Sequence, residues 1–184
     1  MEALNKGKIY IAIDLKSFYA SCECSERNLD PFETNLVVAD PERSKATLCL
    51  AITPAMKKLG VKNRCRINEI PPDIKYITAP PRMQLYIDYS AKIYSIYLRY
   101  ISKEDIHVYS IDECFAEYVP VPGDNGDPVK AAHIIKDVIR NKLGFTVNVG
   151  ISTNRLLAKM ASDFEKPDKV HTLFPKEIPV KMWP

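Results

Sequence analysis

The segment Lys8-Ile9-Tyr10-Ile11-Ala12-Ile13-Asp14 is a short apolar run that ends at a carboxylate. A run of this length, with β-branched and aromatic residues, is typical of a strand buried on both faces, because such a strand has no solvent side to alternate with. Residues 17–27 then show the pattern of a helix. We therefore expect Asp14 at the C-terminal end of a core strand.

The second half of the chain adds three helices and three strands. Residues 83–101 predict a long amphipathic helix, since apolar side chains such as Leu85, Tyr89 and Ile93 recur on one side. The elements expected after it are strands at 106–111 and 114–119, a helix at 129–143, a strand at 145–151, and a helix capped by Ser152 or Thr153 that ends near Phe164. Together with the first strand they give the β-α-β-β-α-β order of an α+β, ferredoxin-like fold.

Residues from about Phe18 to Ala79 stand outside that order as an insertion. Within it, residues 36–38 and 47–52 predict strands, and residues 54–59 predict a helix that ends at Gly60. The insertion is thus expected to be a small α/β element.

The crossover between the first two strands is expected to bring acidic residues together. A right-handed crossover makes the second strand parallel to the first, so both strands end at the same edge of the sheet. Asp14 ends the first strand, and Asp112-Glu113 turn out of the second strand into the third. Three carboxylates from two distant parts of the chain would therefore meet at one sheet edge.

Crowded carboxylates repel one another unless a cation neutralises them. Mg²⁺ or Mn²⁺ suits such an oxygen-rich set, and two ions about 4 Å apart would serve an in-line displacement at phosphorus. Each residue also has a simpler explanation: Asp14 as a helix cap, Asp112 as a turn residue, and Glu113 as a solvent-facing side chain.

The composition places the chain among globular proteins without a membrane partner. Its 184 residues are 46% hydrophobic and 27% charged, no apolar stretch reaches the length of a membrane span, and the N-terminus has no signal-peptide core. Five cysteines without metal-ligand spacing are typical of free thiols in a reducing cytoplasm. The expected location is therefore cytoplasmic.

The net charge of +3 conceals a basic segment. Residues 41–66 contain seven Lys or Arg and one acid, which gives +6 over 26 residues. A surface that faces phosphate groups and an ordinary solvated helix face both explain such a run.

Three motifs resemble conserved stretches of the Y-family translesion DNA polymerases. They are Ile13-Asp14-Leu15-Lys16-Ser17-Phe18-Tyr19-Ala20-Ser21-Cys22-Glu23; Ser110-Ile111-Asp112-Glu113, which matches S-x-D-E; and Val149-Gly150-Ile151-Ser152 followed by Asn154, Ala158-Lys159 and Lys166-Pro167. The resemblance runs from Ile9 to about Trp183 and looks closest to the UmuC-like branch. It implies a polymerase palm at 1–17 and 80–174, a fingers domain at 18–79, and at 175–184 the start of a linker to a thumb domain beyond this chain.

The resemblance also implies the catalytic residues and a two-metal cofactor. Asp14 and Asp112 would bridge two Mg²⁺ ions, for which Mn²⁺ would substitute, and the Leu15 carbonyl would bind the ion on the nucleotide side. Glu113 would hold the ion that activates the primer 3′-hydroxyl.

The nucleotide contacts that the resemblance implies come from Phe18, Tyr19, Thr53, Lys57 and Lys166. Tyr19 would be the steric gate that excludes a ribose 2′-hydroxyl, although an aromatic residue on a helix face also suits core packing. Leu48 and Leu50 would cover the nascent base pair, although a β-strand core explains them equally well. For Lys166 the simpler explanation is an exposed lysine near the end of a helix.

Two positions depart from the family pattern. Many relatives have Tyr-Glu-Ala-Arg where this chain has Pro54-Ala55-Met56-Lys57, so no tyrosine hydroxyl is available there for the triphosphate. Lys16 stands where relatives often have an acid.

The activity implied is template-directed DNA synthesis by an error-tolerant polymerase acting in damage bypass. Its substrates would be primer-template DNA and a deoxynucleoside triphosphate, with a sliding clamp and a recombinase filament as further family partners. Two other functions stay open: a palm-type nucleotide cyclase, against which the insertion and Tyr19 argue, and a non-catalytic scaffold that binds DNA or a partner, against which the acid trio argues.

Overall fold

The structure is a computed structural model that describes residues 7–40, 42–44, 46–165 and 167–182. It divides into two compact units, a large unit formed by Met1–Lys16 with Ser90–Pro184 and an insertion unit formed by Ser17–Tyr89. The chain enters the insertion unit directly after the first strand and leaves it inside helix α3 (Met83–Tyr97), which therefore contributes to both units. The expected palm-fingers boundary at residues 79–80 thus lies before that helix, whereas the second unit boundary lies within it.

The large unit is built on a five-stranded sheet with the order β5-β6-β1-β7-β8. Its strands are β1 (Tyr10–Leu15), β5 (Ile106–Val108), β6 (Glu113–Glu117), β7 (Val147–Ser152) and β8 (Val170–Thr172). The central strand β1 is antiparallel to β6 and β7, and β5 is antiparallel to β6, so β5 runs parallel to β1. The ferredoxin-like order is therefore confirmed, with β8 as an additional strand parallel to β7.

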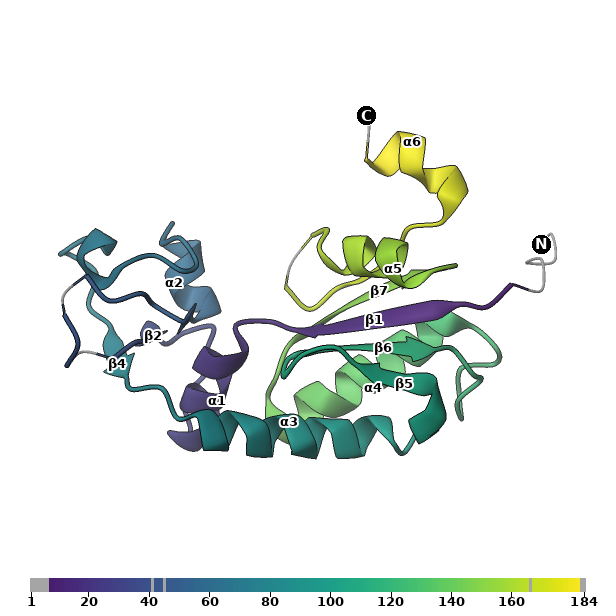
Figure 1. The fold of residues 1–184 in the computed structure, drawn as a ribbon, viewed down its shortest axis with the longest axis horizontal. Coiled ribbons are helices and arrows are strands. Elements are labelled where there is room, and N and C mark those ends of the chain that lie inside the picture. The colour runs from purple at the N-terminus through teal and green to yellow at the C-terminus, as the bar shows by residue number, and fades with distance from the viewer. Residues whose placement is uncertain (1–6, 41, 45, 166, 183–184) are drawn as a thin grey trace. The chain divides into compact units, whose positions relative to one another are not determined.

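Two helices cover opposite faces of this sheet (Figure 1): α4 (Pro128–Leu143) and α5 (Arg155–Ser162). Helix α4 begins where the Asp127 carboxylate accepts a hydrogen bond from the Val129 N–H, and it ends at Gly144, whose φ of 73° favours glycine. Helix α5 lies on the face that carries Tyr10 and Ala12, because its Ala158 packs in their cluster.

The cap of α5 differs from the prediction. The Asn154 side chain, rather than Ser152 or Thr153, accepts a hydrogen bond of 2.9 Å from the Leu157 N–H. Ser152 is still part of β7, because it pairs with Tyr10 of β1. The strand therefore continues past the residue that the sequence pattern assigned to the helix start.

The smaller elements of the large unit are the 3-10 helices η2 (Lys103–Asp105) and η3 (Pro175–Glu177) and the short helix α6 (Ile178–Lys181). Among the described residues, no helix is both long and apolar enough to cross a membrane.

The insertion unit has a three-stranded sheet of its own, in the order β3-β2-β4. Its elements are α1 (Phe18–Glu26), β2 (Leu36–Val38), β3 (Ala51–Ile52), α2 (Pro54–Lys58), η1 (Ile67–Glu69) and β4 (Ile77–Ala79). The strand expected at 47–52 is shorter, because the chain changes partner: Leu50 donates to Val38, whereas Cys49 donates to Cys65. Strand β4, which pairs with β2 in parallel, was not predicted.

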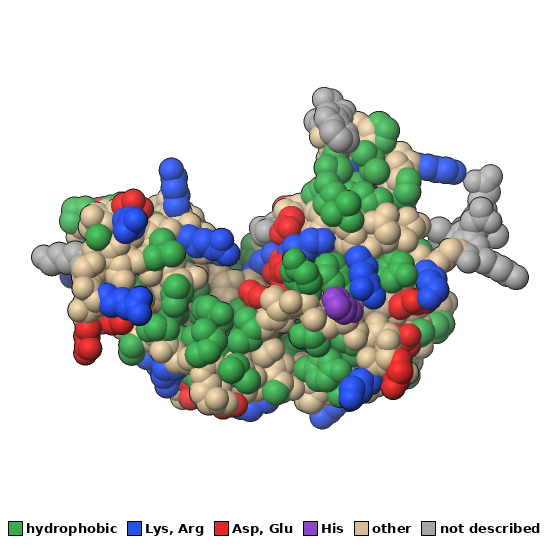
Figure 2. Space-filling model, in the orientation of Figure 1, with side chains coloured by type: hydrophobic (Ala, Val, Ile, Leu, Met, Phe, Trp, Pro, Cys, Tyr) green, Lys and Arg blue, Asp and Glu red, His purple; other side chains and the backbone are tan. Residues whose placement is uncertain are grey.

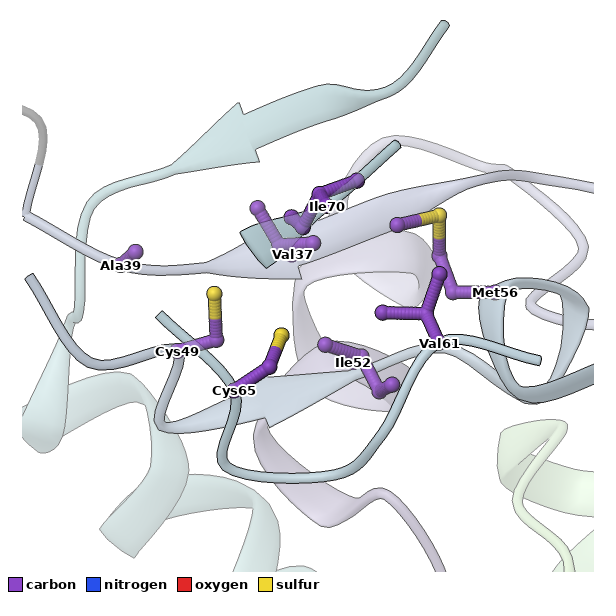
Figure 3. Close-up of a cluster of buried hydrophobic side chains, with 8 residues drawn as sticks. All are labelled: Val37, Ala39, Cys49, Ile52, Met56, Val61, Cys65 and Ile70. Carbon is purple, nitrogen blue, oxygen red and sulfur yellow. The ribbon is translucent and has the colours of Figure 1, made fainter. Parts of the chain in front are cut away.

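A cluster of buried side chains fills the core of this unit (Figure 3). Its members are Val37, Ala39, Cys49, Ile52, Met56, Val61, Cys65 and Ile70. Burial, together with the neighbouring Cys65 thiol, raises the pKa of Cys49 to about 12, so this residue serves as a small apolar side chain. All five cysteines of the chain are free and buried, as the sequence predicts.

One buried carboxylate ties α1 to α3 within the insertion unit. Glu23 is fully buried and accepts hydrogen bonds from Arg82 Nε at 3.0 Å, from the Tyr86 hydroxyl at 2.8 Å, and from Arg27. Burial alone would raise the pKa of Glu23, but the hydrogen bonds from Arg82, Tyr86 and Arg27 outweigh it and hold the pKa below its ordinary value. The carboxylate is thus ionised and fully partnered.

Replacing Glu23→Gln should lower the free energy of unfolding by about 3 kcal/mol at neutral pH, because it removes the charge that these donors share. The depressed pKa makes this stabilisation present above the ordinary value of 4.5 and lost as the pH falls through the folded-state pKa. Urea unfolding at pH 7 and pH 3 checks both points. The difference in the free energy of unfolding between wild type and Glu23→Gln should be smaller at pH 3 than at pH 7. Glu33→Gln, at an exposed carboxylate of the same unit, is the control, and an equal loss in both variants would contradict the assignment.

Candidate active site

Strand pairing places Asp14 directly opposite Glu113. Asp14 in β1 and Glu113 in β6 are partners in the antiparallel register, and the Leu15 N–H donates to the Asp112 carbonyl at 2.9 Å. The sequence predicted that Glu113 lies in the turn before the strand, but in the structure it is the first residue of β6. The structure therefore brings together the backbone positions of all three acids at one edge of the sheet.

The side chains of Asp14 and Glu113 meet at a lysine ammonium. Lys159 of α5 donates to Asp14 Oδ2 at 2.7 Å and also to Glu113 Oε1, and Lys16 donates to the same Asp14 oxygen. Burial alone would lower the pKa of Lys159, but its hydrogen bonds with Asp14 and Glu113 outweigh this and raise the pKa above its ordinary value. A positive charge thus already sits between the two carboxylates.

Serine hydroxyl groups bond to the third acid, Asp112, and to the residue before it. Asp112 Oδ1 accepts a hydrogen bond of 2.8 Å from Ser110, the serine of the S-x-D-E motif. One residue upstream of Asp112, the Ile111 carbonyl accepts a hydrogen bond of 2.7 Å from Ser90 of α3. Sequence reasoning missed these serine roles, although the S-x-D-E spacing contained the signal for Ser110.

Carboxylate oxygens gathered around one positive charge are suitable ligands for a hard divalent cation. In the part of the chain that the structure describes, however, no three His, Cys, Asp or Glu side chains come together as a ready ligand group. Asp14 and Glu113 share the Lys159 ammonium, while the Asp112 carboxylate is bonded to Ser110. Two of the three acids thus converge on one ammonium, and the third is bonded separately to a serine hydroxyl.

Of the residues predicted to bind nucleotide, several lie in the insertion unit. Phe18 is buried, and the half-buried ring of Tyr19 stacks on Tyr86 with a centroid separation of 4.4 Å. The buried hydroxyl oxygen of Thr53 accepts hydrogen bonds from the Leu36 and Met56 N–H groups, so this residue caps α2. Thr53 therefore has a structural role that the sequence did not reveal.

The other predicted contacts differ in their exposure. Leu48 and Leu50 are 47% and 43% exposed, which argues against the alternative that they belong to the strand core. Lys57 is exposed on α2, and Lys166 lies outside the described residues.

The described Lys and Arg side chains of the basic segment, residues 41–66, are all exposed. Its Lys and Arg side chains at the surface are Arg43, Lys57, Lys58, Lys62, Arg64 and Arg66. Over the face drawn in Figure 2, basic side chains lie among acidic and hydrophobic ones rather than in one field of a single sign. On this face, attraction for phosphate groups is therefore local rather than spread over one basic field.

Helix α5 is held close to β7, and this contact positions Lys159. A Cβ atom at Gly150 of β7 would lie 1.9 Å from the Ala158 carbonyl oxygen and 2.4 Å from the Ser162 nitrogen. The buried Asn148 amide donates to the Ser162 carbonyl at 3.0 Å. Only glycine allows so close an approach, a role that the Val149–Ser152 motif contained but sequence reasoning did not assign.

Comparison with known proteins identifies the family. Residues 13–163 match the impB/mucB/samB family, and the chain belongs to it. Over 188 residues the chain is 38% identical to DNA polymerase IV of Clostridium acetobutylicum, covering 97% of this chain and 46% of that protein. It is 32% identical over 180 residues to the putative UV-damage repair protein UvrX of Bacillus subtilis, covering 96% of this chain and 42% of that protein. The chain thus spans less than half the length of these curated relatives.

Solved structures agree with this assignment. The insertion ternary complex of Dbh DNA polymerase superimposes with a TM-score of 0.77 at 28% identity, over 92% of this chain and 50% of the other. The crystal structure of DinB from Sulfolobus solfataricus gives a TM-score of 0.74 at 28% identity, over 92% of this chain and 49% of the other. The expected membership of the Y-family polymerases is therefore confirmed, while the UmuC-like branch stays a prediction.

Gly150→Ala should destabilise the large unit by about 2–3 kcal/mol, because the added methyl group meets helix backbone that cannot rotate away. Urea unfolding monitored by circular dichroism measures the change. Thr153→Ala, at an exposed position just beyond the strand, is the matched control and should leave stability within about 0.5 kcal/mol of wild type. Equal stability of Gly150→Ala and wild type would refute the close helix–strand contact.

Proposed function

We propose that this chain is the palm and fingers portion of a translesion DNA polymerase. The reaction is template-directed transfer of a deoxynucleotidyl group to a primer 3′-hydroxyl, with release of pyrophosphate. The observation that carries the proposal is the cross-strand pair of Asp14 and Glu113, with Asp112 beside it, in a member of the impB/mucB/samB family. The palm would comprise residues 1–17 and 80–174, and the fingers residues 18–79.

The acids at the sheet edge would hold two divalent ions, Mg²⁺ or Mn²⁺. Asp14 and Asp112 would be shared ligands, with the Leu15 carbonyl on the nucleotide side and Glu113 on the primer side. When bound, the ions would lower the pKa of the primer hydroxyl and neutralise charge on the phosphates. The fit rests on the carboxylate oxygens that already surround the Lys159 ammonium.

The protein groups would orient the reactants around this site. Ser110 keeps the Asp112 carboxylate in one position, which limits the reorganisation needed when charge develops. Lys57 and Lys166 would bind the triphosphate as point charges, and the exposed Leu48 and Leu50 side chains would cover the nascent base pair.

The substrates would be primer-template DNA and a deoxynucleoside triphosphate. Two of the similar solved structures are titled as ternary complexes of Dbh, which supports this substrate class. Five free thiols agree with the cytoplasmic location expected from the sequence. Binding of a sliding clamp or a recombinase filament stays a prediction.

Primer extension tests the reaction, with the DNA in excess at low salt so that phosphate contacts are strong. With Mg²⁺ or Mn²⁺ the wild-type chain should extend the primer, and Asp112→Asn should reduce extension by at least about 100-fold while leaving thermal stability near that of wild type. Wild-type-like extension by this variant would refute the role of Asp112. A cyclic product from GTP or ATP alone would indicate a nucleotide cyclase instead, and DNA binding without synthesis would indicate a scaffold.

Tyr19→Ala should raise incorporation of ribonucleotides relative to deoxyribonucleotides by about tenfold, equivalent to about 1.4 kcal/mol of lost discrimination. The reason is that the ring would block a 2′-hydroxyl. Tyr19→Phe keeps the ring and its stacking on Tyr86, so it should discriminate like wild type. Unchanged sugar selectivity in Tyr19→Ala, measured by single-nucleotide incorporation, would disprove the gate.

A further inference from the structure

Five charged side chains of the large unit form a connected cluster at the sheet edge. Lys159 contacts Asp14, Glu113 and Asp163, and Lys16 contacts Asp14 and Asp163. The cluster is unevenly exposed, since the Asp14 and Lys16 side chains are 10% and 12% exposed and that of Asp163 is 45% exposed. Three acids and two lysines thus share one site, in which Asp163 is the most exposed side chain.

We propose that Lys159 is an internal counter-ion which holds Asp14 and Glu113 together without a divalent cation and which must move aside for that cation to bind. This inference rests on the metal-binding role proposed above for the two acids. Lys159 then sets how tightly the site binds metal and keeps the sheet edge intact between metal-bound states.

The first argument is that one set of oxygens cannot serve both cations. Lys159 bonds to Asp14 Oδ2 and to Glu113 Oε1, which face each other across β1 and β6. A divalent ion on these oxygens would lie within a few ångströms of the ammonium, where two positive charges repel strongly in a poorly solvated site. Binding therefore requires that Lys159 exchange its partners.

The second argument is that the structure offers Lys159 another partner. Asp163, the C-cap residue of α5, lies four residues after Lys159, and its carboxylate is 3.5 Å from the Lys159 ammonium. Since the Lys159 side chain is 28% exposed and that of Asp163 is 45% exposed, a small rotation would carry the ammonium from the buried acids toward Asp163. The lysine would keep an ion pair in both positions.

The third argument is that Lys159 joins the two acids directly. The Lys159 ammonium pairs with both Asp14 and Glu113, whereas the Lys16 ammonium pairs with Asp14 and Asp163. Removing Lys159 would remove the ammonium that Asp14 and Glu113 share, and two facing carboxylates are costly when they are partly buried. Replacing Lys159 is therefore expected to destabilise the site when no divalent cation is bound.

The test measures Mn²⁺ binding by calorimetry or electron paramagnetic resonance, and thermal unfolding in EDTA, without using catalytic activity. Lys159→Met should bind Mn²⁺ about tenfold more tightly than wild type, a coupling of ordinary size for two sites, and should unfold at a lower temperature in EDTA. Lys159→Arg keeps the charge and should resemble wild type in both measurements. Lys169→Met, at a half-exposed lysine of the same unit, is the surface control.

The outcomes separate this inference from the proposed function. If wild type binds Mn²⁺ and Asp14→Asn abolishes the binding, the metal site stands, and unchanged or weaker Mn²⁺ binding by Lys159→Met then overturns the counter-ion role alone. If Mn²⁺ binding does not depend on Asp14, both the metal site and the counter-ion role fail. If Lys159→Met does not fold even with Mn²⁺, Lys159→Arg becomes the deciding variant. It should fold and should bind Mn²⁺ with wild-type affinity. Tighter Mn²⁺ binding by Lys159→Arg would refute the competition between the two positive charges.

Discussion

The pairing of β1 with β6 is the constraint on which the site depends. Because the register sets Asp14 opposite Glu113, two carboxylates are held at a fixed separation by backbone hydrogen bonds rather than by flexible loops. A shift of one residue would turn Asp14 to the other face of the sheet, away from Lys159 and among the apolar side chains of the core. Ile11 and Ile13 point to the face of β1 opposite Asp14. The alternation of these side chains therefore fixes the register that places Asp14 opposite Glu113.

Much of the fold follows from local patterns, and the exceptions have physical causes. The apolar run before Asp14, the periodic helix after Pro81 and the strand and helix patterns of residues 106–151 together predict the ferredoxin-like order, which the strand pairing confirms. Strands β4 and β8 were missed because each is a short edge strand with partly exposed residues and no clear alternation. The start of α5 was misplaced because pairing between β7 and β1 extends the strand through Ser152, and this is a tertiary effect.

Some residues of the candidate site could also be predicted from the sequence, and others could not. The acids could be placed at one edge because strand ends are readable from hydrophobicity, and the family motif supplied their roles. The lysine between them could not be placed, because the position of Lys159 depends on how closely α5 approaches β7, which Gly150 and Asn148 determine. The sequence shows that Lys16 stands where relatives often have an acid. The ion pair between Lys16 and Asp14, however, depends on the fold and could not be predicted.

The position of helix α3 across the boundary between the two units limits how related proteins can recombine. The insertion unit begins after Lys16 and ends within this helix. If the insertion unit of a related protein replaced this one, its C-terminal end would therefore have to join the rest of the chain in the middle of α3. Each residue gained or lost at that junction would rotate everything beyond it by about 100° around the helix axis. Recombination between relatives is therefore restricted to junctions that preserve helical phase, and loops in the insertion remain free to vary in length.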